Sequence, residues 1–358
     1  MNIKSLLLGS AAALFAVSGA QAADAIIAAE PEPLEYVRVC DAFGTGFFYI
    51  PGTETCLKIG GYVRFQVSVG EGISGSSDWD AFTDARVTLT ASNDTEFGTL
   101  TSFIGLETLG NNVDQPNADF NTGGDFGVEE AYIELAGFKV GHFFSWWDDG
   151  LSGESDTLAT NALFNSVSYT YEAGNFFAGV SVDELEDLST SPNGLGVAGT
   201  ASATLGGVTL TGLVGYDSEI EEVAVRGILA ADVGPGVFQV AGVYVTENDN
   251  GSAQNAYYAA SEWTVAVHYA LRASDKLVIT PEFQYFGNIN PNEFFDLAVP
   301  FAGFDDGNDA YVVGLTAEYA VTEGLGLLAT VNYTEVDDAP IGVDEDSVGG
   351  FLRLQRNF

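Results

Sequence analysis

Residues 57–69 read Leu-Lys-Ile-Gly-Gly-Tyr-Val-Arg-Phe-Gln-Val-Ser-Val, and this stretch decides the fold class. Its odd positions are apolar with one exception, a glycine, whereas lysine, tyrosine, arginine, glutamine and serine occupy even positions. Such alternation indicates a β-strand with one face in an apolar environment and the other in water. We count about 16 segments of this kind along the chain. The clearest others are 81–92, 262–270, 277–286, 311–319 and 325–333.

The connections between these segments alternate between tight turns and longer polar loops. Tight turns are expected near 93–95, 136–137, 172–175, 206–207, 232–236, 272–276 and 321–324. Longer loops are expected near 70–80, 108–125, 145–164, 183–195, 217–222, 247–258, 287–308 and 336–347. This alternation is typical of an up-and-down antiparallel barrel in an outer membrane, whereas a soluble β-sandwich has no reason to keep it. The eight long loops predict 16 strands, with both termini on the short-turn side.

The two faces of the expected strands differ in chemistry. The apolar face carries aromatic residues near the strand ends, as in the aromatic girdles at membrane interfaces. The opposite face is rich in Thr, Ser, Gly and Gln and suits a wet lumen. A barrel of about 16 strands is too wide for its side chains to fill. We therefore predict an all-β transmembrane barrel over residues 56–358, whose lumen is a channel, a plugged pore or a ligand cavity.

The first 22 residues have the features of an export signal. Lys4 is their only charge, residues 6–17 are apolar or small, and Ala20-Gln21-Ala22 fits the cleavage pattern. The apolar run has about twelve residues, where a membrane-spanning helix needs roughly 20. We expect cleavage before Ala23, which leaves an N-terminal segment, 23–55, ahead of the barrel. No later stretch offers the roughly 18 consecutive apolar residues of a transmembrane helix.

Two cysteines, Cys40 and Cys56, lie at the end of this N-terminal segment. An exported chain meets an oxidising compartment, where paired thiols are the usual state. We therefore expect a Cys40–Cys56 disulfide that closes a loop before the first long strand.

The overall charge excludes several functions. The chain has 358 residues with 51 Asp and Glu against 11 Lys and Arg, a net charge of −40, whereas a nucleic-acid-binding protein needs a basic surface. An enzyme is also disfavoured, because His142 and His268 are the only histidines and neither has a recognisable catalytic context. The sequence has no Gly-rich phosphate loop and no Cys/His cluster, so we expect neither a cofactor nor a metal site.

The final residues carry a further marker. Leu352, Leu354 and Phe358 share one face of the last expected strand, and the chain ends on Phe358. A terminal Phe preceded by alternate apolar residues is the pattern by which outer-membrane barrels are recognised for assembly. We therefore assign Phe358 to an assembly signal.

With these features in place, the sequence resembles the general porin family of alphaproteobacteria. The resemblance covers essentially the whole chain and is most distinctive around the cysteines. The matching blocks are 1–10, 35–44 (Glu-Tyr-Val-Arg-Val-Cys-Asp-Ala-Phe-Gly), 48–57 (Phe-Tyr-Ile-Pro-Gly-Thr-Glu-Thr-Cys-Leu), 61–64 and 354–358 (Leu-Gln-Arg-Asn-Phe). The resemblance implies a homotrimer of 16-stranded barrels in the outer membrane of a Gram-negative bacterium. It further implies passage of small hydrophilic solutes, and a third external loop folded into each pore.

Charged residues for such a constriction are present in the sequence. The third long loop, 145–164, carries four acids, and the wet face of the strands carries bases that we expect to face them. The acids are Asp148, Asp149, Glu154 and Asp156, and the bases are Lys58, Arg64, Arg86, Arg226 and Arg353. Opposed rows of this kind create a field across a pore. The alternative is that the acids are only solvated and the arginines pair with local carboxylates.

Acids are also concentrated in the long loops as a class. These loops hold roughly thirty acids and no Lys or Arg, so a pore would have a negative mouth that attracts cations. We expect a cation-preferring channel, with loop acids that contact lipopolysaccharide through divalent cations. The alternative explanation for the acidic loops is that they serve only to keep the protein soluble. A substrate-specific channel or a non-conducting adhesin barrel remain alternative functions; Phe103, Phe177 and Phe351 fall on the wet face but form no continuous aromatic run.

Overall fold

The structure of the protein is a computed structural model that describes residues 37–74, 77–110, 127–185, 194–246, 255–290, 304, 307–337 and 345–358. The expected signal peptide, the leader that follows it and parts of six expected long loops lie outside these residues. The chain divides into two units, 1–38 and 39–358, and the second contains every described strand.

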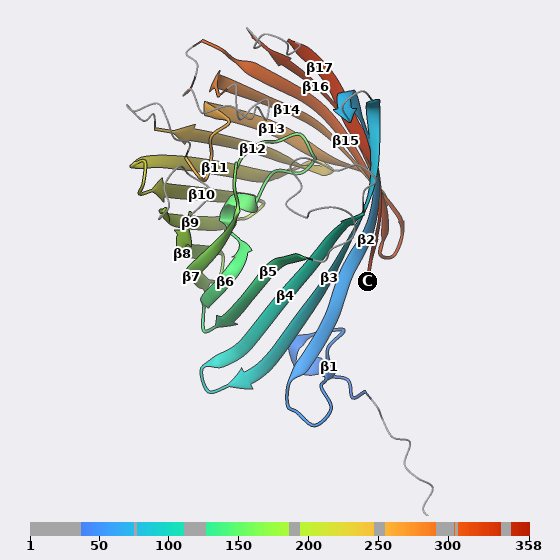
Figure 1. Ribbon diagram of the computed structural model, residues 1–358, viewed down its shortest axis with the longest axis vertical. Helices are drawn as coiled ribbons and strands as arrows, with labels where there is room; N and C mark the ends of the chain where they lie inside the picture. Colours follow the sequence, from blue (N-terminus) through green and yellow to red (C-terminus); the bar gives the residue numbers. More distant parts are fainter. Residues whose placement is uncertain are drawn as a thin grey trace, which may run out of the picture. The chain divides into compact units, whose positions relative to one another are not determined.

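Unit 39–358 is a closed antiparallel barrel. Within the described residues, sixteen consecutive strands each pair with the next, and the last pairs with the first, so the ring has no free edge (Figure 1). These strands are β2 Cys56–Ser74, β3 Ser77–Thr95, β4 Gly98–Gly110, β5 Gly127–Leu135, β6 Phe138–Phe144, β7 Leu163–Ala173, β8 Phe176–Glu184, β9 Leu195–Leu205, β10 Val208–Asp217, β11 Glu222–Val233, β12 Gly236–Val245, β13 Ser261–Ser274, β14 Leu277–Ile289, β15 Ala310–Thr322, β16 Leu325–Val336 and β17 Asp346–Asn357. The predicted fold class and strand number are confirmed. None of the helices in the described part of the chain is both long and apolar enough to cross a membrane.

One end of the barrel carries seven two-residue turns: 96–97, 136–137, 174–175, 206–207, 234–235, 275–276 and 323–324. Six lie within the predicted turns, whereas the first follows the predicted residues 93–95, which still pair with β4 as part of β3. At the other end, two of the eight expected long loops are short. Only residues 75–76 separate β2 from β3, and 218–221 separate β10 from β11. The first difference arises because β2 and β3 keep pairing with each other beyond Gly70 and Thr83, where their other neighbours stop. Glycine and serine mark loops only statistically, and backbone pairing overrides them here.

Strict alternation gives the barrel two different faces. On β2, Ile59, Val63 and Phe65 point outward and are about half exposed, whereas Gln66 points inward and is 7% exposed. On β13, Trp263 and Val265 are exposed, while Thr264, Ala266 and His268 are buried. The outer face is therefore apolar and the inner face holds the polar side chains, as the period of two predicts.

The N-terminal part of this unit is attached to the first residues of β2. Cys40 and Cys56 form the expected disulfide, with Cα atoms 6.0 Å apart. The chain between them forms the 3-10 helix η1, Asp41–Phe43, and the short strand β1, Phe48–Tyr49, which pairs with the first two residues of β2.

The last strand ends just above this point. Asn357 pairs with Tyr62. The amide of Phe358 donates to the carbonyl of Gly61 (3.1 Å), and the amide of Gly61 donates to the carbonyl of Phe358 (3.2 Å). Below Gly61, β1 takes the place along β2 that β17 leaves. The backbone of the first strand is thus paired down to its first residue, Cys56.

The disulfide generates a simple prediction. Protein that is denatured without reductant should incorporate no maleimide, because the structure has no free cysteine, and reduced protein should incorporate two per chain by mass spectrometry. The Cys40→Ser variant is the control and should incorporate one without reduction. Labelling of unreduced wild-type protein would contradict the pairing.

Candidate functional site

The segment that joins β6 to β7, residues 145–162, lies inside the ring of strands (Figure 1). We call it the acidic segment. Its ends meet where the amide of Ser145 donates to the carbonyl of Ala162 (2.7 Å). It begins with the 3-10 helix η2, Trp146–Asp148, which the Ser145 hydroxyl caps by accepting from the amide of Trp147 (3.2 Å). Beyond η2, side chains from the inner face of distant strands hold its backbone.

Arg226 of β11 holds the start of the acidic segment. Its guanidinium donates to the carbonyls of Trp146 (2.6 Å), Trp147 (2.8 Å) and Leu158 (3.2 Å). Arg226 is 1% exposed, and a buried guanidinium needs acceptors just as the last carbonyls of a short helix need donors. Arg226 lies on the inner face, as its position in the alternation predicts. However, the acidic segment covers it, so it does not line the open lumen.

Two side chains of β14 hold the middle of the acidic segment. Glu282 accepts from the amides of Glu154 (3.0 Å) and Ser155 (2.7 Å). Gln284 accepts from the amide of Thr157 and donates to its carbonyl, both at 2.8 Å. The backbone of the segment is thereby fixed to the inner face of β14.

The preceding residues are held from β12 and β13. The amide of Ser152 donates to Gln239 (2.9 Å), and its carbonyl accepts from Nδ1 of His268 (2.6 Å). Gly153 follows with φ of +103°, and a Cβ there would lie 2.4 Å from the carboxyl carbon of Glu282. Glycine is therefore required at this close approach.

The residues that support the acidic segment were missed by sequence reasoning. The available signal was a set of large polar side chains on the wet face of neighbouring strands: Gln239, His268, Glu282 and Gln284. The alternation places them in the lumen, but it does not say which loop they contact.

An apolar core fills one side of the lumen. It lies between the acidic segment, residues 255–260 and the inner faces of β9 to β15, where small residues such as Ala198, Ala224 and Ala266 leave room. Its largest members are Trp147, Phe164, Tyr257, Tyr258 and Phe286. Among the described residues of this core, none comes from β2, β3, β4, β5 or β17. The inner faces of those five strands thus form the wall that remains opposite the acidic segment.

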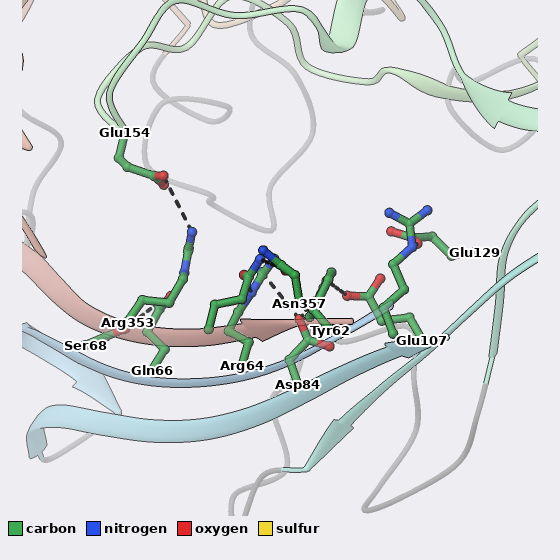
Figure 2. Close-up of polar contacts among 12 residues, drawn as sticks. Tyr62, Arg64, Gln66, Ser68, Asp84, Glu107, Glu129, Glu154, Arg353 and Asn357 are labelled. Carbon is green, nitrogen blue, oxygen red and sulfur yellow. Dashed lines mark hydrogen bonds and ion pairs between the residues drawn. The ribbon is translucent and has the colours of Figure 1, made fainter. Parts of the chain in front are cut away.

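This opposite wall carries charged side chains of both signs (Figure 2). Arg64 on β2 contacts Asp84 on β3 at 3.4 Å and donates to Gln355 on β17 at 3.0 Å. The hydroxyl of Tyr62 donates to Glu107 on β4 (2.6 Å) and lies 3.1 Å from Asp84. Arg64 therefore lies on the wall, as expected, but its guanidinium is paired with the carboxylate of Asp84 on the neighbouring strand, and Glu107 lies close by on β4.

Arg86 on β3 is paired with two consecutive acids of β5. Its Nε lies 2.7 Å from Glu129, and its other guanidinium nitrogen pairs with Glu130. Strict alternation would place these two acids on opposite faces. The pairing of β4 with β5 shifts register between Gly105 and Leu106, and this β-bulge brings both carboxylates to the same arginine.

One ion pair joins the acidic segment to this wall. Figure 2 shows Glu154 and Arg353 of β17 extending toward each other, with 3.5 Å between their charged atoms, while Arg353 also donates to Gln66 (2.8 Å). A cavity of about 490 Å³ lies beside Arg64 and Arg353. Glu154 and Arg353 are the pair from the predicted opposed rows that the structure brings into contact.

The other loop acids differ in their surroundings. Asp148, Asp149 and Asp156 line a cavity of about 530 Å³, but Asp156 turns back to accept from the amide of Leu151 (3.2 Å). Burial raises the pKa of all four acids of the segment. Repulsion from Asp149 adds to the rise at Asp148, while Arg353 opposes the rise at Glu154.

Lys58, the remaining expected base, lies away from these ion pairs. It is on β2 near the short-turn end, with its ammonium 5.9 Å from the ring of Phe47 in the disulfide loop. Within the described ranges, no group of His, Cys, Asp and Glu is arranged to hold a metal ion.

Comparison with known proteins identifies the family. Residues 24–351 match the porin subfamily. The chain is 44% identical to outer membrane protein IIIA of Rhizobium leguminosarum bv. viciae, over 98% of this chain and 93% of that protein. It is 34% identical to porin Omp2a of Brucella melitensis over 100% of both chains. The trimer form of OmpT, an outer membrane protein of Vibrio cholerae, has the same fold, with a TM-score of 0.62 at 14% identity over 86% of this chain and 100% of that chain. The chain therefore belongs to the porin subfamily, and the protein is a porin of the outer membrane.

Proposed function

We propose that this porin is a general, cation-preferring channel for small hydrophilic solutes, with the acidic segment as its constriction. As a porin it is a diffusion channel rather than an enzyme. The observation that carries the proposal is the contact of Glu154 with Arg353, where the acidic segment reaches the opposite wall of the lumen. Where these two residues meet, the passage is bounded by the acidic segment on one side and by β2, β3, β4, β5 and β17 on the other.

The balance of charge at this level supports a preference for cations. Seven carboxyl groups face three arginines there: Asp84, Glu107, Glu129, Glu130, Asp148, Asp149 and Glu154 against Arg64, Arg86 and Arg353. Each arginine is paired with at least one of these acids, so none presents an uncompensated positive charge to a passing ion. Charges in a narrow, poorly hydrated passage act more strongly than in bulk water, so the excess of acids favours cations.

The aromatic residues of the inner face argue against a sugar-specific channel. Phe103 stacks on Tyr132 with ring centres 5.0 Å apart, and Phe177 contacts Trp146 at 6.4 Å. The Phe351 ring lies beneath the guanidinium of Arg353, at 4.5 Å. These rings are on β4, β8 and β17, each engaged with its own neighbours, and they form no continuous path for a sugar.

The oligomer and the outer surface complete the proposal. OmpT of Vibrio cholerae, which shares the fold, has been solved in a trimer form, and we propose a homotrimer for this chain as well. We also propose that acids of the external loops contact lipopolysaccharide through divalent cations, since roughly thirty acids lie in these loops without a Lys or Arg. Residues 1–22 are proposed to be removed on export.

The general-channel proposal predicts the behaviour of the purified protein in planar lipid bilayers. We expect ohmic single-channel currents in KCl that added disaccharides reduce only through solution viscosity, because the inner-face rings of the described strands form no continuous aromatic path. Concentration-dependent, saturable block by a sugar would show a substrate-specific channel instead. Absence of conductance from correctly folded trimers would point to the adhesin alternative.

Neutralising the acidic segment should reduce the cation preference. In the variant Asp148→Asn, Asp149→Asn, Glu154→Gln, Asp156→Asn, the reversal potential in a KCl gradient should move toward zero, because the passage loses four carboxyl groups, of which Glu154 forms an ion pair with a wall arginine, Arg353. A matched variant with Asp94→Asn, Glu172→Gln and Asp232→Asn, near the short turns, is the control and should keep the wild-type value. An unchanged reversal potential in the first variant would overturn the assigned role.

Cation preference should also fall as the pH is lowered. Because burial raises the pKa of the four segment acids, they bind protons at a higher pH than exposed carboxyls, which titrate near about 4. As the pH is lowered, the reversal potential of the wild type should therefore begin to fall toward zero before the pH reaches about 4. The neutralised variant should show a weaker fall over the same pH range. Superimposable pH profiles would show that other groups set the preference.

A further inference from the structure

We infer that Tyr257, in the connection between β12 and β13, is a positioning residue that locks the acidic segment in the lumen. This inference rests on the proposed role of that segment as the constriction. Residues 255–260, which we call the Tyr257 segment, also fold inward, and Tyr257 and Tyr258 are 0% exposed. The porin thus has a second inward segment that sequence reasoning did not identify.

The ring of Tyr257 lies between both ends of the acidic segment. Its centre is 5.5 Å from the ring of Trp147, in the first turn of that segment, and 5.4 Å from the ring of Phe164, just after its last residue. Buried aromatic contacts of this kind bring large apolar areas together in a defined geometry. A single side chain therefore joins the entry and the exit of the segment.

Backbone contacts extend this attachment along the returning limb. The amide of Thr160 donates to the carbonyl of Tyr257, the hydroxyl of Thr160 accepts from the amide of Ala259, and the side chain of Asn161 donates to the carbonyl of Ala256, each at 2.9 Å. The strands β12 to β14 hold residues 152–157. The Tyr257 segment holds the residues that follow.

The hydroxyl of Tyr257 is fixed to the barrel wall. It donates to Asp183 of β8 at 2.7 Å, and Asp183 also accepts from Ser166 of β7 (2.6 Å) and Ser181 of β8 (3.0 Å). Asp183 is 0% exposed, so its charge depends on these donors. Loss of the tyrosine hydroxyl would leave this buried carboxylate with fewer partners.

Two inner-face glycines form the socket that receives the ring. A Cβ on Gly196 of β9 would lie 2.1 Å from the Tyr257 hydroxyl oxygen, and a Cβ on Gly215 of β10 would lie 2.5 Å from the ring carbon Cδ2. Any other residue at either position would displace the tyrosine. The wall of β9 and β10 is therefore shaped to accept this side chain, which a loop resting against the barrel by chance would not require.

The lock can be tested by measuring attachment and conduction separately. In a Leu158→Cys background, the new thiol is buried at the returning limb, and the native cysteines are held in their disulfide. Adding Tyr257→Ala removes a buried aromatic side chain and should increase the labelling rate by a small methanethiosulfonate reagent on the order of a hundredfold. Single-channel conductance should rise and the current should become noisier, because the constriction is no longer fixed.

Control variants separate the lock from general damage to the barrel. Tyr244→Ala removes a tyrosine from the outer face of the adjacent strand β12, where it is 49% exposed, and should change neither labelling nor conductance. Tyr257→Phe keeps the ring and should recover most of the protection, whereas Gly215→Ala, which obstructs the socket, should reproduce the Ala phenotype. If Tyr257→Ala does not assemble, Gly215→Ala and Asp183→Asn provide the same comparison in milder form.

The labelling rate tests whether Tyr257 locks the acidic segment, and conductance and selectivity test whether that segment is the constriction. Slow labelling in correctly assembled Tyr257→Ala and Gly215→Ala porin overturns the lock. Fast labelling with altered conductance supports both the lock and the constriction. Fast labelling with wild-type conductance and selectivity supports the lock but shows that the acidic segment is not the constriction.

Discussion

Every strand of this barrel needs two hydrogen-bonded neighbours, because the hydrocarbon of a membrane offers no partner to a bare strand edge. The pairing of β17 with β2 meets this requirement and closes the ring. Closure at sixteen strands in turn fixes the width of the lumen, which side chains of the wall alone do not fill. The inner face must therefore meet either water or another part of the chain, and this porin uses both: an apolar core covers the inner faces of β9 to β15, and a charged wall is left on the other side.

The charged wall differs from a simple row of positive charges. Arg64 and Arg86 each contact carboxylates on neighbouring strands, and only Arg353 reaches an acid of the acidic segment. These carboxylates hold the arginine side chains in place across the sheet, and their negative charge cancels much of the electric field of the arginines. The ion pairs thus fix the positions of these side chains, and among the residues described on this wall the carboxyl groups Asp84, Glu107, Glu129 and Glu130 outnumber the arginines Arg64, Arg86 and Arg353.

The strand alternation and the spacing of turns were enough to predict the fold and the strand number, because both depend on local patterns. The disulfide was predicted from the export signal, because an exported chain meets an oxidising compartment. The same alternation placed Arg64, Arg86 and Arg353 on the inner face. It could not show that Arg226 is covered, since the carbonyls of Trp146 and Trp147 reach it from about 80 residues away in sequence. The β-bulge at Glu129 and the space that Gly196 and Gly215 leave for Tyr257 could not be predicted either. Both depend on contacts between segments that are distant in sequence, which the alternation within one strand does not specify.

The bonds between Phe358 and Gly61 have a consequence for the order of events in assembly. The closing seam joins the first long strand to the last residues of the chain, so no intermediate length of chain can complete it. A growing or partly exported chain that lacks β17 has two open edges, and the ring becomes continuous only when β17 pairs with β2. The described strand that is made last is thus the strand that completes the wall.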